Sequence, residues 1–287
     1  TFKHETIMKN RILVMGFLLT AAMMLFSGCA SDDAVSDSSK GVNTPVNMKI
    51  SVVDGSFASA DKTAAKSRTT DTDYGTTFTN GDMIGVVVIN TVGNSVITAN
   101  EKYTLTGGKW LNSAGNEYLP YLSTYRYFAY YPYSETAPTL STSGFTTTST
   151  AADLFSTVIS AWDPGTDQST HALYTAKDLM VSEATVNAST GYTFSMAHQM
   201  ALMEMDFAQV GWFYDGGADY KYRFDSYSPL DMGGGKYRLL VKPSSAVEVA
   251  GKVYTNRTTT NQAWYISETS PAKANYKVYT LGGAAAS

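Results

Sequence analysis

The sequence has few of the residues on which several classes of protein depend. It contains one cysteine among 287 residues, which excludes a disulfide-stapled fold and a metal cluster held by thiolates. Only 16% of the residues are charged, and 21 basic against 25 acidic side chains give a formal net charge of -4. This composition argues against a long-helix or coiled-coil protein and lacks the basic surface that binds nucleic acid. We therefore expect no nucleic-acid partner.

The residues that are abundant favour a packed β-protein. The chain is 44% hydrophobic and 13% aromatic, enough for a real core and too apolar for intrinsic disorder. Met48–Val53 alternates and stops at the turn signal Asp54-Gly55, Met83–Ile89 is a continuous apolar run, and Tyr125–Tyr133 is rich in tyrosine. Strand-like segments recur roughly every ten residues between Gly, Asn, Asp and Ser clusters, a spacing typical of β-sandwiches. The sequence predicts an all-β chain of two tandem β-sandwiches.

The later part of the chain continues this pattern. Ala137–Thr150 is dominated by Ser and Thr and is expected to be a surface loop. Ala151–Ala161 fits either a short helix or a strand, because its periodicity does not separate the two. Further strands are expected at Leu179–Val181, Tyr192–Met196, Leu202–Phe207, Tyr220–Phe224, Tyr237–Val241, Val247–Tyr254, Ala263–Ile266 and Tyr276–Leu281.

The N-terminal segment predicts where the protein is located. Met8 is followed by two basic residues and by an apolar run, Ile12–Phe26, which is too short to span a bilayer and suits the core of a signal peptide. The sequence Leu-Phe-Ser-Gly-Cys that ends at Cys29 resembles a bacterial lipobox, with Phe26 where Leu is more usual. Lipidation of Cys29, with palmitate among the acyl chains, would anchor the mature protein in the outer membrane.

The order of these segments predicts the domain organisation. Residues 1–28 are expected to be upstream sequence and signal peptide, and 29–44 a tether. An N-terminal β-sandwich is expected at 45–186 and a C-terminal one at 187–287. Acidic residues close behind Cys29 resemble a signal for export to the cell surface.

Residues that could carry chemistry are sparse. The sequence has no serine-hydrolase, zinc-protease or phosphate-loop motif. His171 lies in a polar stretch, and His198 lies between apolar residues, where a histidine is usually a satisfied structural residue. Asp163 and Asp167 could offer two carboxylates to Ca²⁺, but their spacing matches no strong calcium-loop signature and favours a turn. We expect no enzymatic activity, no metal and no cofactor.

A small, polar loop follows the first predicted strand. Ala60–Ser67 leads to Arg68, and Thr69–Thr77 leads on to the first long apolar strand. Such loops are where proteases cut. Cleavage at Arg68 with loss of Met48–Val53 would leave a sandwich with an open edge, which is a template for a strand from another chain. This arrangement is a physical route to a polymer.

Several motifs together resemble the fimbrillin-like family of Bacteroidota. They are Phe78-x-x-Gly81-Asp82-x-Ile84-Gly85-Val86, the Tyr103 and Trp110 stretch, Tyr118-x-Pro120, Phe128–Tyr133, Asp178-Leu179-Met180 and Phe194-x-x-x-His198-Gln-Met-Ala-Leu-Met203. The resemblance implies two transthyretin-like β-sandwich domains and a non-enzymatic subunit of a type V pilus that supports adhesion. Its expected partners are other fimbrial subunits and a host or bacterial surface ligand.

The resemblance also implies a maturation route. A lipoprotein precursor would be cut by an Arg-specific protease between Arg68 and Thr69, and a strand from a neighbouring subunit would fill the vacated groove. The donor candidates are Tyr276, Val278 and Thr280, which alternate along the last predicted strand. The small residues 282–287 bury little apolar area and would make a poor donor. Three alternatives stay open: the donor is Tyr276–Leu281, the sequence stops before its natural end, or the subunit is not part of a shaft.

A second function also fits the sequence. A surface glycan-binding lipoprotein of a nutrient-uptake system would have the same export signals and would use exposed aromatic side chains. Its binding residues would include one or two of Trp162, Trp212 and Trp264.

Overall fold

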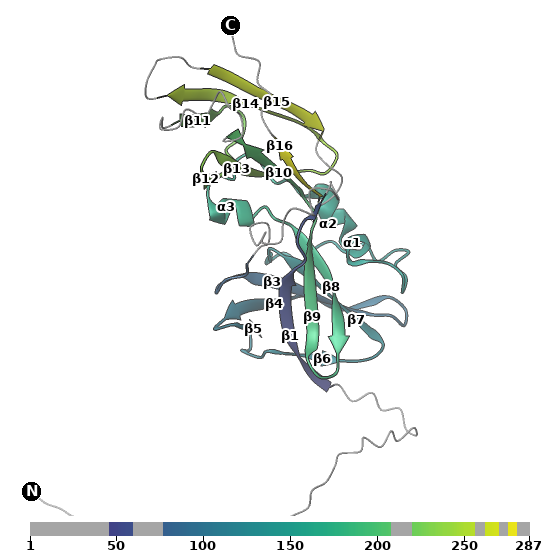
Figure 1. Cartoon of the computed structure of the whole chain (residues 1–287). Helices are drawn as coiled ribbons and strands as arrows, with labels where there is room; N and C mark the ends of the chain where they lie inside the picture. The colour runs from purple at the N-terminus through teal and green to yellow at the C-terminus, as the bar shows by residue number, and fades with distance from the viewer. Residues whose placement is uncertain (1–45, 60–76, 208–219, 256–261, 270–274, 280–287) are drawn as a thin grey trace, which may run out of the picture. The chain divides into compact units, whose positions relative to one another are not determined.

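A computed structural model of the chain describes residues 46–59, 77–207, 220–255, 262–269 and 275–279 (Figure 1). The structure is predominantly β, with three short helices among the described residues, so the expected all-β class is confirmed. All of the described residues belong to one compact unit.

Eight strands form the first sheet, in the order β5-β4-β3-β7-β8-β9-β1-β6. Neighbouring strands are antiparallel except for β1 and β9, which run parallel. The strands are β1 (Val46–Asp54), β3 (Met83–Asn90), β4 (Ser95–Thr106), β5 (Lys109–Asn112), β6 (Tyr118–Tyr121), β7 (Tyr125–Tyr131), β8 (Met180–Asn187) and β9 (Gly191–His198).

Both faces of the central strand β3 are buried, which explains why its sequence is continuously apolar. Val86 and its alternate neighbours belong to a cluster with Tyr127, Tyr192 and Phe194. Val87 and Ile89 belong to a second cluster that also holds side chains of the segment around 145–159.

The segment Ala151–Ala161 is helical, which settles one of the alternatives left open by the sequence. It forms α1 (Ala151–Leu154) and α2 (Ser156–Ala161). Thr150 and Asp153 make a reciprocal capping box, in which each side chain accepts from the other's backbone N–H. The fully buried Leu154 and Phe155 pack in the second cluster beside the sheet.

Two smaller sheets enclose a third core. One has the order β12-β13-β10-β16-β2 and the other the order β11-β14-β15. Side chains of both sheets meet in one apolar cluster, where the ring of Phe207 lies 5.1 Å from that of Trp264. The strands are β2 (Ala58–Ser59), β10 (Ala201–Asp206), β11 (Tyr220–Phe224), β12 (Leu230–Gly233), β13 (Lys236–Val241), β14 (Ala246–Thr255), β15 (Gln262–Thr269) and β16 (Asn275–Tyr279).

A buried glutamine connects the segment after α2 to these smaller sheets. Gln168 is fully buried; its Nε2 donates to the carbonyl of Leu240, and its Oε1 accepts from the Leu240 N–H, both at 2.8 Å. The next helix, α3 (His171–Thr175), buries Tyr174 against a cluster that includes Leu202. The amide therefore completes the hydrogen bonding of a buried backbone position.

The turn from β8 to β9 lies within the first sheet. These two strands pair with each other from Met180 and His198 to Asn187 and Gly191. The boundary expected between residues 186 and 187 therefore falls inside a hairpin, and both of its strands belong to the eight-stranded sheet.

Candidate functional site

Strand β1 lies between β9 and β6 in the first sheet and precedes Arg68 in the sequence. It pairs in parallel with β9 from Ile50↔Tyr192 to Asp54↔Met196, and antiparallel with β6 from Val46↔Tyr121 to Lys49↔Tyr118. Figure 1 shows β1 alongside β9. We call this location between β9 and β6 the β1 position.

The side chains of β1 alternate between core and solvent. Ile50 is buried, and Met48 and Val52 are partly buried against the same cluster as Tyr192. Val53, on the opposite face, is 44% exposed. The strand therefore contributes one full and two partial apolar side chains to the core, and main-chain pairing supplies much of its attachment.

A glycine allows the main chain of β1 to approach β9 closely. Gly191 has a φ of +92°, and a Cβ on this residue would lie closer than 3.0 Å to the carbonyl oxygen of Lys49. A second close approach follows at the end of the strand, where the Gly55 N–H donates to the carbonyl of Met196 at 2.8 Å. Both contacts involve backbone atoms, which cannot rotate away.

The inward side chain at the end of β1 joins a buried polar network. Asp54 Oδ1 lies 2.8 Å from His198 Nε2, and Asp178 Oδ1 lies 2.7 Å from His198 Nδ1. The side chain of His198 is 0% exposed, that of Asp178 is 1% and that of Asp54 is 11%. Both ring nitrogens can donate only when the imidazole is protonated, so two carboxylates flank an imidazolium.

The charges around His198 favour that protonation. Burial opposes the charge, but the carboxylates of Asp178 and Asp54 outweigh it and raise the pKa of His198 from 6.5 to about 9. The Phe57 ring stacks on the imidazole, with centroids 3.7 Å apart and planes 15° apart. Both ring nitrogens of His198 have a partner, as expected for a satisfied residue, and these partners lie 20 and 144 residues away along the chain.

The segment continues from β1 into the five-stranded sheet. Ala58 and Ser59 form β2, which pairs in parallel with Asn275 and Tyr276 of β16. Between the two strands, Phe57 packs against the cluster of Tyr174, Met200, Leu202 and Leu240. One segment of 14 described residues, 46–59, thus adds a strand to each of two sheets.

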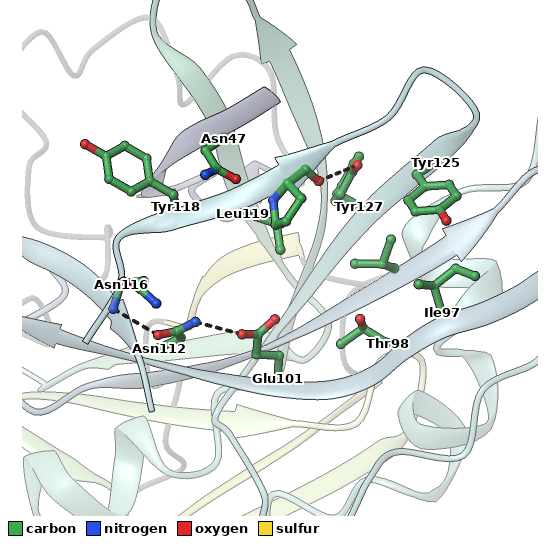
Figure 2. Close-up of a pocket in the computed structure, with 12 residues that line it drawn as sticks. Asn47, Ile97, Thr98, Glu101, Asn112, Asn116, Tyr118, Leu119, Tyr125 and Tyr127 are labelled. Carbon is green, nitrogen blue, oxygen red and sulfur yellow. Dashed lines mark hydrogen bonds between the residues drawn. The ribbon is translucent and has the colours of Figure 1, made fainter. Parts of the chain in front are cut away.

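A pocket lies beside the start of β1. Its volume is about 470 Å³, and Tyr118 and Ile97 on its wall are 41% and 48% exposed. Figure 2 shows Asn112 in a short chain of hydrogen bonds, in which its Nδ2 donates to Glu101 and its Oδ1 accepts from the Asn116 N–H, both at 2.9 Å. The lining residues are Asn47, Val88, Ile97, Thr98, Glu101, Asn112, Asn116, Tyr118, Leu119, Pro120, Tyr125 and Tyr127. The wall combines aromatic rings with amide and carboxylate oxygens.

Several residues selected from the sequence lie outside the described residues. These are Cys29, Arg68, Thr69, Trp212 and Thr280. Tyr276 and Val278 lie in β16, between β10 and β2. Their strand is therefore paired on both sides within its own chain.

The structure describes two of the tryptophans proposed as glycan contacts. Trp264 is 2% exposed and packs against Phe207 and Phe224, so the expectation that it contacts a surface ligand is wrong. Trp162 is partly buried, and its Nε1 donates to the carbonyl of Lys177 at 2.9 Å.

The described part of the chain contains neither a cluster of metal-ligand side chains nor a membrane-spanning helix. In those residues, no three His, Cys, Asp or Glu side chains are grouped as metal ligands. The same residues contain no helix with the length and hydropathy needed to cross a membrane.

A family model described as fimbrillin-like matches residues 67–284, which is most of the chain. The chain belongs to the fimbrillin-like family. This fimbrillin-like chain is 26% identical, over an alignment of 307 positions, to a curated Bacteroides ovatus protein named as the fimbrium tip subunit Fim1C. The alignment covers 96% of the chain and 53% of that relative, so the chain spans about half of its length.

A solved structure supports the fold of this fimbrillin-like chain. A fimbrial protein from Bacteroides ovatus superposes with a TM-score of 0.55 at 22% sequence identity. The match covers 84% of the chain and 50% of that protein.

Proposed function

We propose that this chain is a structural or accessory subunit of a cell-surface type V fimbria and that it acts by strand exchange and adhesion rather than by catalysis. Its membership of the fimbrillin-like family and its similarity to a fimbrium tip subunit support this role. The expected domains are two transthyretin-like β-sandwiches, and we place their division after His198, because β9 pairs with β8 and β1.

The proposed route begins with export as a lipoprotein. Cys29 receives the lipid and anchors the chain in the outer membrane, facing outward, with residues 29–44 as a tether. Proteolysis after Arg68 then separates the lipidated segment, which includes β1 and β2, from the remainder of the chain.

The interior location of β1 is the single observation that carries the proposal. Removing β1 leaves the main-chain edges of β9 and β6 without their shared partner and uncovers Tyr192 and its apolar neighbours. An unpaired strand edge beside apolar side chains is a template for a strand from another chain. A neighbouring subunit supplies that strand in the proposed polymer.

The proposed donor of this chain is its last strand, with Tyr276, Val278 and Thr280 as the alternating positions. β16 pairs with β10 on one side and with β2 on the other. Loss of β2 frees one of these edges, but donation to another subunit also requires β16 to leave β10.

Cleavage and assembly can be tested together on residues 30–287, which lack the lipidated cysteine. An Arg-specific protease is added, the cut is mapped by intact mass, and assembly is followed by size-exclusion chromatography and electron microscopy. We expect one early cut after Arg68, followed by oligomers. Arg68→Ala should abolish both, whereas the matched variant Lys66→Ala should change neither. A stable monomer after a clean cut would refute a role in the shaft.

The pocket beside β1 favours a second, related function. Exposed Tyr118, together with the oxygens of Glu101 and Asn112, offers the stacking and hydrogen bonding that a saccharide requires. A surface glycan-binding lipoprotein therefore remains the alternative. Saturable binding on a glycan array that Tyr118→Ala abolishes and the exposed control Val92→Ala leaves unchanged would support it. Binding that persists in Tyr118→Ala would exclude this pocket.

A further inference from the structure

The network at the end of β1 specifies one side chain of the strand that fills the β1 position. We infer that His198 makes this position selective for a strand that carries a carboxylate where β1 carries Asp54. The inference rests on the proposed strand exchange. It identifies the partner by its chemistry: an extended segment with apolar residues at alternate positions and an acidic residue at the end of that series.

The proposed cleavage divides the network of Asp54, His198 and Asp178 between two parts of the chain. His198 ends β9 and Asp178 directly precedes Leu179 and β8, so both stay with the body of the chain when the segment before Arg68 is removed. Asp54 is on the removed segment. After exchange, His198 keeps the contact to Asp178 and loses the contact that Nε2 makes at 2.8 Å.

The His198 ring is buried from solvent when a strand occupies the β1 position. The His198 side chain is 0% exposed while β1 is in place. An incoming strand in the same register covers the ring again and removes Nε2–H from water. A buried charged donor without an acceptor is costly, and removing one partner of a buried ion pair is more costly than removing an exposed one. A carboxylate on the incoming strand restores the contact.

The register of β1 defines the rest of the matching sequence. Ile50, Val52 and Asp54 face the same side, opposite Tyr192, Phe194 and Met196 of β9. The next residue is Gly55, where a Cβ would lie 2.8 Å from the Met196 carbonyl oxygen. The matching strand therefore has apolar residues four and two positions before the acidic residue, and a glycine directly after it.

The last strand of this chain does not fit that description. β16 reads Asn-Tyr-Lys-Val-Tyr and contains Lys277 but no carboxylate. By this criterion, β16 from a second copy is a poor match for the β1 position, and a strand from a different subunit is the better one. The strand that this chain accepts at the β1 position would therefore differ in sequence from the strand that it donates.

The experiment compares two peptides on the same protein. Residues 30–287 are cut with an Arg-specific protease, the released segment is removed in urea, and the body is refolded with a fluorescent peptide of residues 46–57. Affinity is measured by anisotropy for this peptide, for its Asp54→Asn form, and for a Val53→Asn control altered on the exposed face. We expect the Asp54→Asn peptide to bind at least about tenfold more weakly and the control to bind within about twofold of the parent.

The body of the protein supplies the second comparison. In a His198→Gln chain, the difference between the two peptides should fall below about twofold, because the cation that distinguishes acid from amide is gone. If that variant does not refold, the same comparison at about pH 10 removes the charge from the unaltered ring. Burial raises the pKa of the neighbouring Tyr174, which therefore stays neutral there, while Asp54 and Asp178 stay ionised.

Each outcome decides a different question. Tighter binding of the acidic peptide that depends on His198 supports the inference. Equal binding of the acid and amide peptides overturns the inference and leaves strand exchange standing. Failure of all three peptides to bind overturns the inference and the proposed exchange together.

Discussion

Substitution of Gly191 by alanine tests whether β1 is held by the close approach of main chains. Gly191 has a φ of +92°, and an added Cβ would lie closer than 3.0 Å to the Lys49 carbonyl oxygen. Gly93 provides a matched control, since its φ is +83° and nothing lies within 4 Å of its Cβ direction. Both variants place an alanine at a positive φ, and only Gly191→Ala adds a contact with β1.

The difference in free energy of unfolding between the two variants can be estimated from these contacts. A positive φ costs an alanine about 1–2 kcal/mol, which both variants lose. In Gly191→Ala, β1 must also move away, because the clashing atoms belong to its backbone. Loss of one or two hydrogen bonds at about 0.5–1.5 kcal/mol each, with partial exposure of Ile50, adds about 2–3 kcal/mol. We expect a total of roughly 3–5 kcal/mol for Gly191→Ala and 1–2 kcal/mol for Gly93→Ala.

Urea denaturation gives the two free energies of unfolding, and hydrogen exchange shows where the loss occurs. Amides of β1 should exchange faster in Gly191→Ala, while those of β3 and β7 should follow global stability. Equal destabilisation by the two variants, with unchanged exchange in β1, would refute the view that β1 packs directly against Gly191.

Three further predictions concern the same sheet. Ile50→Ala should lower the free energy of unfolding by about 2–5 kcal/mol in urea denaturation, whereas the exposed control Val53→Ala should change it by less than about 0.5 kcal/mol. The pKa of His198 is raised from 6.5 to about 9, so its stabilising contribution is complete below pH 6.5 and is lost as the pH rises through 9. Denaturation across that range should show a loss of about 3 kcal/mol that His198→Gln lacks; a flat profile in the parent would contradict the ion pair. Arg126 donates to two carbonyl oxygens in loop 137–150, so Arg126→Met should speed limited proteolysis there, and an unchanged rate would show that the loop is held by other contacts.

The strands that form the cores were predicted from the sequence, because the pattern of apolar residues in each strand reflects which of its faces are buried. The continuous apolar run of β3 and the alternation of β9 each match a strand with the corresponding buried faces. Three strands that were not predicted, β6, β12 and β2, are short and lie at sheet edges. Such strands depend on pairing with a neighbour more than on their own pattern, so local sequence does not reveal them.

The candidate site was harder to predict from the sequence than the fold. Alternation in Met48–Val53 indicates a strand but not its partner, and the parallel pairing with β9 joins segments far apart in the chain. Asp54-Gly55 predicts a turn, but the structure assigns no turn at residues 55–57, which lead on to β2; the Asp54 carboxylate accepts locally from the Ser56 N–H. Nothing local indicates that the same carboxylate reaches His198, 144 residues away. Only the folded sheet brings these groups together.

The balance of forces on β1 explains how an interior strand could be exchangeable. Its only buried side chain is Ile50, while β3 of the same sheet buries six consecutive residues. Main-chain pairing is nearly indifferent to sequence, so it admits many strands, and partly buried positions discriminate weakly among apolar side chains. Selectivity must then come from the few contacts at which a mismatched residue strongly weakens binding. At the β1 position these are a backbone approach that excludes a Cβ at the position of Gly55, directly after the strand, and a buried cation at His198 that requires an acceptor.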